Sequence, residues 1–330
     1  GTSTNMNANE VIANLALEKL GQPKGAYAHL HPNDDVNMSQ STNDAYPTAV
    51  CVGLQFAVEP LVDAIASLKR ALEAKGREFA DVIKMGRTQL QDAVPMTLGL
   101  EFEAFAVNLG EDIDRLREVC TLLCEVNLGG TAIGTGINTH PDYAALAVRR
   151  LAEISGKPIV PASNLVEATS DMGAFVLFSG VLKRFAVKLS KLANDLRLLS
   201  SGPRTGFGEI HLPPMQPGSS IMPGKVNPVI PEAVNQTAYQ VIGNDLAVTM
   251  AAEAGQLQLN AMEPLIVYNL LSSVRMLDAA CRMLEERCIR GIRADREQCR
   301  RHVEHSIGVI TALVPHIGYA NASRIAAQAL

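Results

Sequence analysis

Apolar residues recur every three or four positions in two long segments of the chain. Residues 175 to 199 carry them at Phe175, Phe178, Leu182, Phe185, Leu189, Leu192, Leu196 and Leu199. Residues 98 to 123 carry them at Leu98, Phe102, Phe105, Leu109, Ile113, Leu116, Cys120 and Leu123. This spacing puts one apolar seam along one side of an α-helix, as in a helical bundle. The helix over 175–199 should be roughly 35 Å long, at about 1.5 Å per residue.

A third segment, from Val226 to Val274, contains no Lys or Arg at all. Its charges are the acids Glu232, Asp245, Glu253 and Glu263. Those acids, with scattered Asn and Gln, leave no uninterrupted apolar run of about 18 residues, which argues against a membrane span. A helix with so little charge on any face is typically buried on all sides. We therefore expect it at the centre of an oligomeric bundle, and we predict a homo-oligomer.

Two parts of the chain lack a regular apolar pattern: the first 47 residues and a long segment between two helices. Residues 1 to 47 are rich in Asn, Ser, Thr, Pro and Gly, with one helical stretch near Asn9 to Leu20, and long helices follow from Pro47. Residues 200 to 227 contain five glycines and five prolines. Structureless connections of more than about 12–15 residues are uncommon and are often lids or binding loops.

Composition supports an all-α fold and narrows the class of protein. Apolar residues make up 47% and charged residues 19%, while aromatics are only 4% with no Trp. That mixture suits helices packed on helices better than a β-sandwich. The net charge is −5 and no basic run is present, so nucleic-acid binding is not expected. Six cysteines without a CxxC pair, and no visible signal peptide, indicate a reduced, cytoplasmic protein.

Four separated segments concentrate hydroxyl and amide side chains, and they are the candidates for chemistry. They span residues 2–7, 39–44, 86–92 and 218–228. None has metal-ligand spacing, a P-loop, a dinucleotide fingerprint or a nucleophile elbow. Neutral hydrogen-bond donors with one lysine suit a small dianion, and suit better an intermediate that gains negative charge on a carboxylate.

Each segment also has a purely structural interpretation. Residues 41–44 match a helix cap before Pro47, and residues 2–7 match a polar lead-in. Thr88 and Gln89 match a turn before a helix at Thr97. Asn227 and Pro228 match an ordinary helix start, with Glu232 near its N-terminal dipole. The long loop with two serines, a lysine and an asparagine is the hardest of the four to explain structurally.

The segment Gly218 to Pro228, GSSIMPGKVNP, resembles the signature GSSxMPxKxNP of the fumarase/aspartase superfamily at every specified position. Further segments are similar to this family in the same order: GTSTNMNANEVIAN, HPNDDVNMSQSTND, MGRTQLQDAVPMTLG, GGTAIGTGINTHP and NDLRLLSSGPR. The resemblance covers essentially the whole chain. It implies an all-α fold with a long central helical bundle over 42–297, the end of an N-terminal domain over 1–41 and the start of a C-terminal domain over 298–330. It also implies that both ends are truncated.

The resemblance implies a reversible elimination of ammonia from L-aspartate to give fumarate, in a homotetramer whose active sites are shared between subunits. Ser219 would take the Cβ proton, giving an enediolate intermediate. Lys225 and Asn227 would hold the α-carboxylate, and Asn43, Thr88 and Gln89 would bind the amino group. Donors to the enediolate would be Thr2, Ser41, Thr42 and Ser220. No cofactor is implied, and activation by a divalent cation is not readable from the sequence.

Gln89, Glu232 and two further stretches bear on whether the leaving group is ammonia or water. Fumarases usually carry His where this chain has Gln89, paired with a glutamate that matches Glu232. The stretches 165–171 and 251–260 resemble the ammonia-lyase branch of the family. Fumarate hydratase and a catalytically silent helical oligomer remain as alternatives. His29 and His31 with Asp34 and Asp35 could suggest a metal site, but a hydrogen-bonded turn is the better interpretation.

Overall fold

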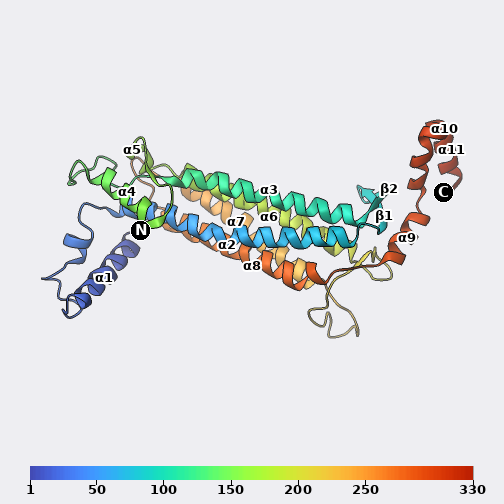
Figure 1. The fold of residues 1–330 in the computed structure, drawn as a ribbon, viewed down its shortest axis with the longest axis horizontal. Coiled ribbons are helices and arrows are strands. Elements are labelled where there is room, and N and C mark those ends of the chain that lie inside the picture. The colour runs from blue at the N-terminus through green and yellow to red at the C-terminus, as the bar shows by residue number, and fades with distance from the viewer. Residues whose placement is uncertain (330) are drawn as a thin grey trace. The chain divides into compact units, whose positions relative to one another are not determined.

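The computed structural model describes residues 1–329, and helices dominate them (Figure 1). Five helices are long: α2 (Thr42–Glu78), α3 (Leu98–Cys120), α6 (Gly173–Leu199), α7 (Val229–Glu253) and α8 (Glu263–Arg287). Each passes from one of two compact units into the other. Within each unit their segments run side by side (Figure 1). The predicted all-α bundle class is confirmed.

Unit 1 comprises Gly1–Leu61, Asp114–Arg184 and Gln240–Met276. Besides parts of the long helices it contains α1 (Thr2–Lys19), α4 (Tyr143–Ser155) and α5 (Leu165–Ala168). Short helical turns lie at Pro32–Val36 and Thr121–Cys124. Strands β3 (Glu125–Val126) and β4 (Val160–Pro161) pair in parallel.

Unit 2 comprises Val62–Ile113, Phe185–Tyr239 and Leu277–Leu330. It holds an antiparallel hairpin of β1 (Ile83–Thr88) and β2 (Gln91–Thr97), and a second antiparallel pair of β5 (Ile210–His211) and β6 (Arg293–Ala294). Short turns at Ile289–Gly291 and Ile307–Leu313 accompany α9 (Arg296–Glu304), α10 (Val314–Ile317) and α11 (Tyr319–Ala329). Phe79, Phe102 and Phe105 pack edge to face in its core, with centroid distances of 5.3 and 5.8 Å.

The apolar seam predicted for 175–199 is confirmed, because all eight of its residues are buried. The seam of α3 is buried as well, apart from partial exposure of Ile113 and Cys120. The segment expected at the centre of an oligomeric bundle is covered on only part of its surface by the single chain. Within the chain, α7 exposes Ile242, Leu246 and Met250. These residues stand four apart and therefore lie along one apolar stripe of the helix.

Two helices begin earlier than the sequence pattern indicated. The polar residues 2–7 are part of α1, so the interpretation as an irregular lead-in is wrong. Asn5 and Asn9 there each donate a side-chain hydrogen bond to Asn37 Oδ1, at 3.2 and 2.9 Å, and these tertiary bonds override their weak helix propensity. Helix α2 begins at Thr42 instead of near Pro47, and Pro47 lies inside it.

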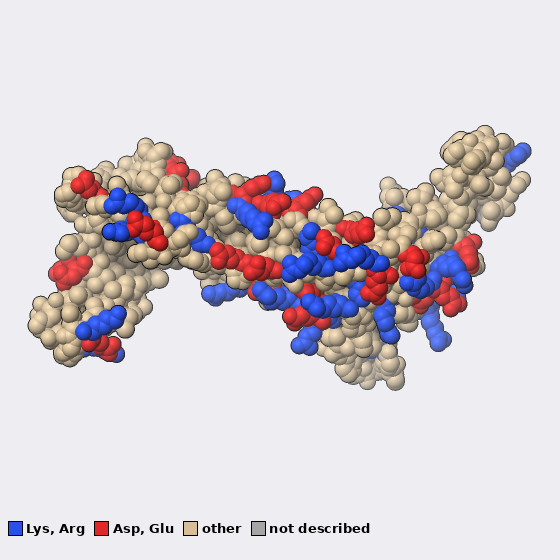
Figure 2. All heavy atoms as spheres, viewed as in Figure 1, with Lys and Arg blue, Asp and Glu red and all other residues tan. Residues whose placement is uncertain are grey.

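Two further observations concern the surface charge and the hydropathy of the helices. On the face shown in Figure 2, Lys and Arg alternate with Asp and Glu along the described helices instead of forming a patch of one sign. By length and composition alone, α2 is apolar enough to cross a membrane, with a mean hydropathy of 1.6 over its best 18-residue window. A core helix passes the same test, and 44% of that window is buried in the fold.

Candidate active site

Ser41, Thr42 and Asn43 lie where α2 begins, in unit 1. The Ser41 hydroxyl oxygen accepts the Asn43 N–H at 3.1 Å, and the Asp44 carboxylate accepts the Ser41 N–H at 2.9 Å. These two bonds cap the start of α2, so the interpretation of residues 41–44 as a helix cap is correct. The Thr42 hydroxyl oxygen accepts from Asn5 Nδ2 at 3.1 Å. Because both hydroxyls act as acceptors here, their own hydrogens are left to donate to an anion.

Asp44 anchors this segment to a second loop. Its side chain is fully buried, and its Oδ2 accepts the N–H groups of Gly129 at 3.0 Å and Thr131 at 2.8 Å. Burial raises the pKa of Asp44 above its ordinary value, although the backbone hydrogen bonds act in the opposite direction. Three backbone donors therefore hold one carboxylate between the start of α2 and residues 129–131.

The second loop is strained and also orients Asn43. Thr131 is buried with φ of 56°, a left-handed conformation that non-glycine residues rarely adopt. Such strain tends to persist at functional sites. Asn43 Nδ2 donates to Ala132 O at 2.8 Å, and Asn127 Nδ2 donates to Asn43 O at 2.9 Å. With its amide nitrogen engaged, Asn43 has its Oδ1 available as an acceptor, which is the group that an amino substrate requires.

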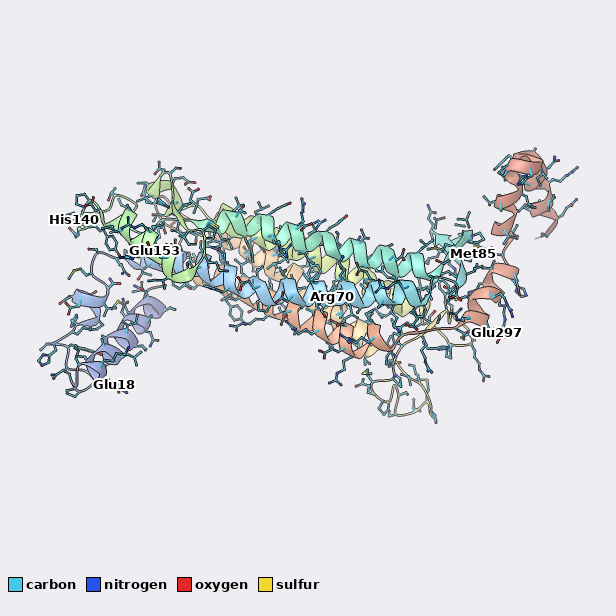
Figure 3. All side chains as sticks on the ribbon, viewed as in Figure 1. Glu18, Arg70, Met85, His140, Glu153 and Glu297 are labelled. Atoms are coloured by element: carbon cyan, nitrogen blue, oxygen red, sulfur yellow. The ribbon has the colours of Figure 1, made fainter. Side chains whose placement is uncertain are left out.

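Thr88 and Gln89 lie at the tip of the β1–β2 hairpin in unit 2. Thr88 pairs with Gln91, so Gln89 and Leu90 form a two-residue turn with φ of 52° and 62°. Both angles match a type I′ turn, which normally carries Asn or Gly. The prediction of a turn is correct, but the flanking strands were missed. Met85, labelled in Figure 3, is fully buried in β1, whereas Thr88 and Gln89 are exposed.

Ser219 and Ser220 lie in the long loop between α6 and α7, also in unit 2. The Ser219 hydroxyl oxygen accepts the N–H groups of Ile221 at 3.2 Å and Met222 at 3.0 Å. Hydrogen bonds of this kind favour the charged form of the group that accepts them. Ser219 is half-buried, and residues 220–226 that follow it are exposed, with Ile221 84% accessible.

The neck of this loop is closed by Lys225 and Asn227. Gly218 N–H donates to Lys225 O at 2.8 Å, and Asn227 Nδ2 donates to Gly218 O at 2.9 Å. A Cβ on Gly218 would lie 2.5 Å from Lys225 O, so the close approach requires glycine. The Lys225 side chain is exposed, and among the described residues no hydrogen bond joins its Nζ to Ser219. Asn227 keeps one amide hydrogen for a ligand.

Glu232 in α7 has Arg197 as its charged neighbour, with 4.0 Å between Nη2 and Oε1. Arg197 also donates from Nη1 to Asn235 Oδ1 at 3.1 Å. This contact was not foreseen, although Arg197 belongs to one of the segments that resemble the family. Glu232 is thus held by an arginine of α6 within unit 2.

The candidates fall into two groups in different compact units. Thr2, Ser41, Thr42 and Asn43 belong to unit 1, while Thr88, Gln89, Ser219, Ser220, Lys225, Asn227 and Glu232 belong to unit 2. Within unit 1, α1 and the start of α2 are joined through Asn5. The sequence indicated no functional role for Asn127, Glu209 or Glu263, and for Asp44 only a place in a helix cap, and all four are buried. For Asn127, Glu209 and Glu263 the sequence signal is a polar side chain within an otherwise apolar or glycine-rich neighbourhood, whereas Asp44 belongs to the polar segment 39–44.

The histidines that raised the question of a metal form a turn. His31 Nδ1 accepts the N–H groups of Asn33 at 3.2 Å and Asp34 at 3.1 Å, and Asp35 accepts the His31 N–H at 2.7 Å. The interpretation as a hydrogen-bonded turn is confirmed. No group of three or more potential metal-binding side chains occurs among residues 1–329.

Glu263, the first residue of α8, is a buried acid in unit 1. Only 6% of it is exposed, and among the described residues its Oε1 has no hydrogen-bond partner. Burial raises the pKa of Glu263 to about 7. The folded protein therefore holds a proton there at pH values where the unfolded chain has released it.

Replacing Glu263 with glutamine should make stability less dependent on pH. Because the folded pKa is raised, stability falls as pH rises from about 4.5 to about 7, and the whole penalty is present above that range. E263Q should exceed the wild type in unfolding free energy by at most about 3 kcal/mol at pH 8 and should equal it near pH 4. Thermal unfolding at both pH values measures this difference. The exposed Glu118→Gln is the control, and an equal shift for E263Q at both pH values would contradict the assignment.

Comparison with known proteins places this geometry in a family. A family model described as Lyase matches residues 1–243. The chain aligns over its full length, at 70% identity, with the aspartate ammonia-lyase of Pseudomonas aeruginosa and covers 70% of it. It is 59% identical to the aspartate ammonia-lyase of Escherichia coli, with 97% of this chain and 67% of that protein aligned.

Solved structures of similar proteins have the same fold as this chain. A fumarate lyase:delta crystallin from Brucella melitensis, bound to cobalt, superposes with a TM-score of 0.97 at 67% identity, covering all of this chain and 72% of that one. A class II fumarase from Schistosoma mansoni superposes with a TM-score of 0.95 at 36% identity, with the same coverage. The chain belongs to this lyase family, the fumarase/aspartase superfamily whose motifs it carries. Its relatives at 59–70% identity bear the name of a carbon–nitrogen lyase, aspartate ammonia-lyase.

Proposed function

We propose that this protein catalyses the reversible elimination of ammonia from L-aspartate to give fumarate. Ser219 takes the Cβ proton, and the electron pair of the broken C–H bond moves into the β-carboxylate as an enediolate. The pair then forms the C=C bond as the C–N bond breaks and ammonia leaves. Every step uses side chains of this protein, so the mechanism requires no cofactor.

The observation that carries this proposal is the environment of the Ser219 hydroxyl. A free serine is far too weak a base for a Cβ proton, and it needs its alkoxide stabilised. The N–H groups of Ile221 and Met222 already point at the hydroxyl oxygen. The positive charge of Lys225, six residues further along the same loop, would add to this stabilisation when the loop closes over substrate.

Hydroxyl hydrogens are available for the charge that develops in the intermediate. Ser41 and Thr42 accept hydrogen bonds through their oxygens and are left to donate, and Thr2 and Ser220 are exposed. Donors aimed at a developing carboxylate charge lower the barrier most when they gain strength in the transition state. Lys225 and Asn227 would bind the α-carboxylate.

Ammonia is favoured over water as the leaving group by two observations. The Asn43 amide presents its oxygen, which accepts from an amino group, and Gln89 stands where fumarases usually carry histidine. Thr88 and Gln89 would complete the amino-group site. Overall similarity points the same way, because identity is 59–70% to aspartate ammonia-lyases and 36% to the class II fumarase.

We further propose a cytoplasmic homotetramer with active sites shared between subunits. In unit 1, Ile242, Leu246 and Met250 of α7 are 37%, 64% and 60% exposed, and Leu265 and Tyr268 of α8 are exposed as well. The α7 residues stand four apart and form one apolar stripe, and an exposed apolar stripe marks a site of protein association. Sedimentation analysis should give four times the chain mass, and L246E should lower that mass. A monomeric wild type would refute this assembly.

The test of the reaction is the product formed from fumarate. With ammonium present the protein should consume fumarate and form aspartate, whereas with fumarate alone it should form no malate. Malate as the main product would identify a fumarate hydratase instead. No turnover under either condition would indicate a catalytically silent helical oligomer. Release of fumarate from L-aspartate, followed by absorbance in the fumarate band, checks the forward direction.

A further inference from the structure

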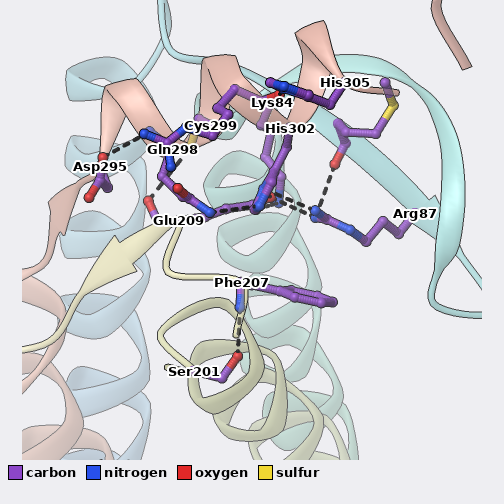
Figure 4. Close-up of polar contacts among 12 residues, drawn as sticks. Lys84, Arg87, Ser201, Phe207, Glu209, Asp295, Gln298, Cys299, His302 and His305 are labelled. Carbon is purple, nitrogen blue, oxygen red and sulfur yellow. Dashed lines mark hydrogen bonds and ion pairs between the residues drawn. The ribbon is translucent and has the colours of Figure 1, made fainter. Parts of the chain in front are cut away.

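A buried carboxylate in unit 2, Glu209, sits among three basic side chains (Figure 4). It is fully buried, with Lys84 Nζ 2.9 Å from Oε2, and with Arg87 Nη1 and His302 Nδ1 at 2.7 and 2.9 Å from Oε1. Burial alone would raise its pKa, but attraction to Lys84 and the hydrogen bonds from Lys84, His302 and Arg87 hold the pKa of Glu209 below its ordinary value. Glu209 therefore carries its charge inside the fold.

The backbone of Glu209 is fixed on both sides. Its N–H donates to Leu199 O at 2.9 Å, and its carbonyl accepts the Asp295 N–H at 2.9 Å. The thiol of Cys299 also donates to that carbonyl, at 3.6 Å. These bonds attach residue 209 to the end of α6 and to the start of α9. The carboxylate is thus a stationary anchor for whatever it binds.

Arg87 is held by this anchor and by further groups around it. Besides its bond to Glu209, its guanidinium lies 4.2 Å from the centre of the Phe207 ring, and its Nη1 donates to Met85 O at 3.3 Å. Its Nη2 is 3.2 Å from His302 Nδ1. His302 is held in turn by Gln298, with 2.8 Å between Nε2 atoms. Lys84 lies in the same strand, further from the turn than Arg87. Its Nζ is also 2.6 Å from Oε2 of Glu101 in α3.

The fixed Arg87 directly precedes Thr88, the first of the two candidate residues at the hairpin tip. Successive side chains of a strand point to opposite faces, so an Arg87 directed at Glu209 leaves Thr88 directed away from it. Thr88, Gln89 and Leu90 are exposed, and a cavity of about 330 Å³ is lined by Gly86, Gln89 and Leu90. Arg87 thus connects the exposed turn with the buried carboxylate of Glu209.

We propose that Glu209 is a positioning residue for the amino-group site, acting through Arg87 on the turn that presents Thr88 and Gln89. The proposal rests on the function proposed above, because it assumes that this turn meets the amino group of aspartate. Glu209 touches no substrate. Its effect is to keep the tip in the conformation that binds, which lowers the entropy lost when substrate arrives.

Glu209→Gln tests this assignment, because it keeps the shape of the side chain and removes its charge. The KM for aspartate should rise about tenfold, the loss expected for weakening one charged hydrogen-bonded contact. The inhibition constant of succinate, a dicarboxylate without an amino group, should stay within twofold. A merely structural role would move both constants together, and that result would overturn the proposal.

Glu285→Gln is the matched control in the same unit. Glu285 is buried, accepts from Ser67 at 3.0 Å and pairs with Arg290 at 2.5 Å, but it belongs to α8 and not to the hairpin environment. E285Q should lower the melting temperature about as much as E209Q and leave the ratio of the two constants unchanged. If E285Q altered that ratio equally, positioning by Glu209 would be refuted.

Arg87 provides the second variant and an independent readout. R87A should raise the aspartate KM as E209Q does. The double variant should raise it no further, since each single change already breaks the same ion pair between Glu209 and Arg87. Additive effects would count against the link. Hydrogen–deuterium exchange of residues 83–97 should speed up in E209Q and not in E285Q. This exchange result holds or fails even if wild-type protein releases no ammonia, so failure of the function and failure of the positioning role are distinguishable.

Discussion

Replacing Ser219 with alanine should lower kcat for ammonia release from L-aspartate by about 10³-fold, within the range by which positioned general bases accelerate proton transfer. The KM for aspartate should change little, because the role proposed for Ser219 is to take the Cβ proton and not to hold the carboxylates. Ser219 is half-buried next to the exposed residues 220–226, and its oxygen only accepts hydrogen bonds from within the loop, so alanine should leave the fold intact. Steady-state kinetics with both parameters resolved is the measurement.

A neighbouring variant separates the base from the rest of the loop. Ser220→Ala removes one proposed donor to the enediolate and should cost about tenfold in kcat, less than S219A. With L-aspartate deuterated at Cβ, the kinetic isotope effect should grow in S219A, since proton transfer then limits the rate. Full activity in S219A, or a larger loss in S220A, would show that Ser219 is not the base.

The bundle was predictable because its signal is local. The eight apolar residues of the 175–199 seam are spaced for one helix face, and the same face is buried in the structure. The GSSIMPGKVNP loop was predictable for a different reason, since a close approach such as Gly218 to Lys225 tolerates few residue types. In both segments the determining chemistry lies within a few dozen consecutive residues.

The features that escaped prediction depend on distant partners. Thr2 to Asn7 reads as a polar lead-in until Asn5 meets Asn37 and Thr42. The β1–β2 hairpin escaped because its turn, Gln89–Leu90, lacks the Asn-Gly signal and β2 contains a proline. The stripe on α7 shows a further limit. The low charge of α7 predicted that the helix is buried, but only the folded chain shows which side of α7 is left uncovered.

This dependence on distant partners also explains why the proposed positioning residue is harder to find from the sequence than the proposed substrate-binding residues. Ser41, Thr42 and Asn43, proposed to bind substrate, stand together in one polar cluster, whereas Glu209 contacts Arg87, which lies 122 positions earlier in the chain. Asp44 has both a neighbouring polar cluster in the sequence and distant partners in the fold. It is sequence-adjacent to the cluster, yet its partners Gly129 and Thr131 lie 85 and 87 residues away. Its role becomes visible only when both loops are in place.

Replacing Asp44 with asparagine should therefore damage both stability and catalysis. The amide has the same shape but presents one N–H₂ group to backbone N–H donors, which leaves buried groups without an acceptor. We expect a loss of about 2–3 kcal/mol in unfolding free energy, reduced from the full desolvation penalty because the carboxylate itself is costly to bury. We expect kcat to fall about 10²-fold, since Ser41 and Asn43 lose their fixed geometry. Denaturant unfolding and kinetics measure the two effects separately.

The temperature of the assay decides whether the Asp44 variant reports on positioning or only on folding. Kinetics of D44N are to be measured well below its melting temperature, where the folded fraction is essentially complete and any loss of kcat belongs to the native state. Asp63→Asn, an exposed change on the same helix, should alter neither quantity. A D44N protein that is destabilised but retains wild-type kcat would show that Asp44 anchors the loops without positioning Ser41 to Asn43. A loss of kcat at full folding would place the carboxylate among the groups that preorganise the site.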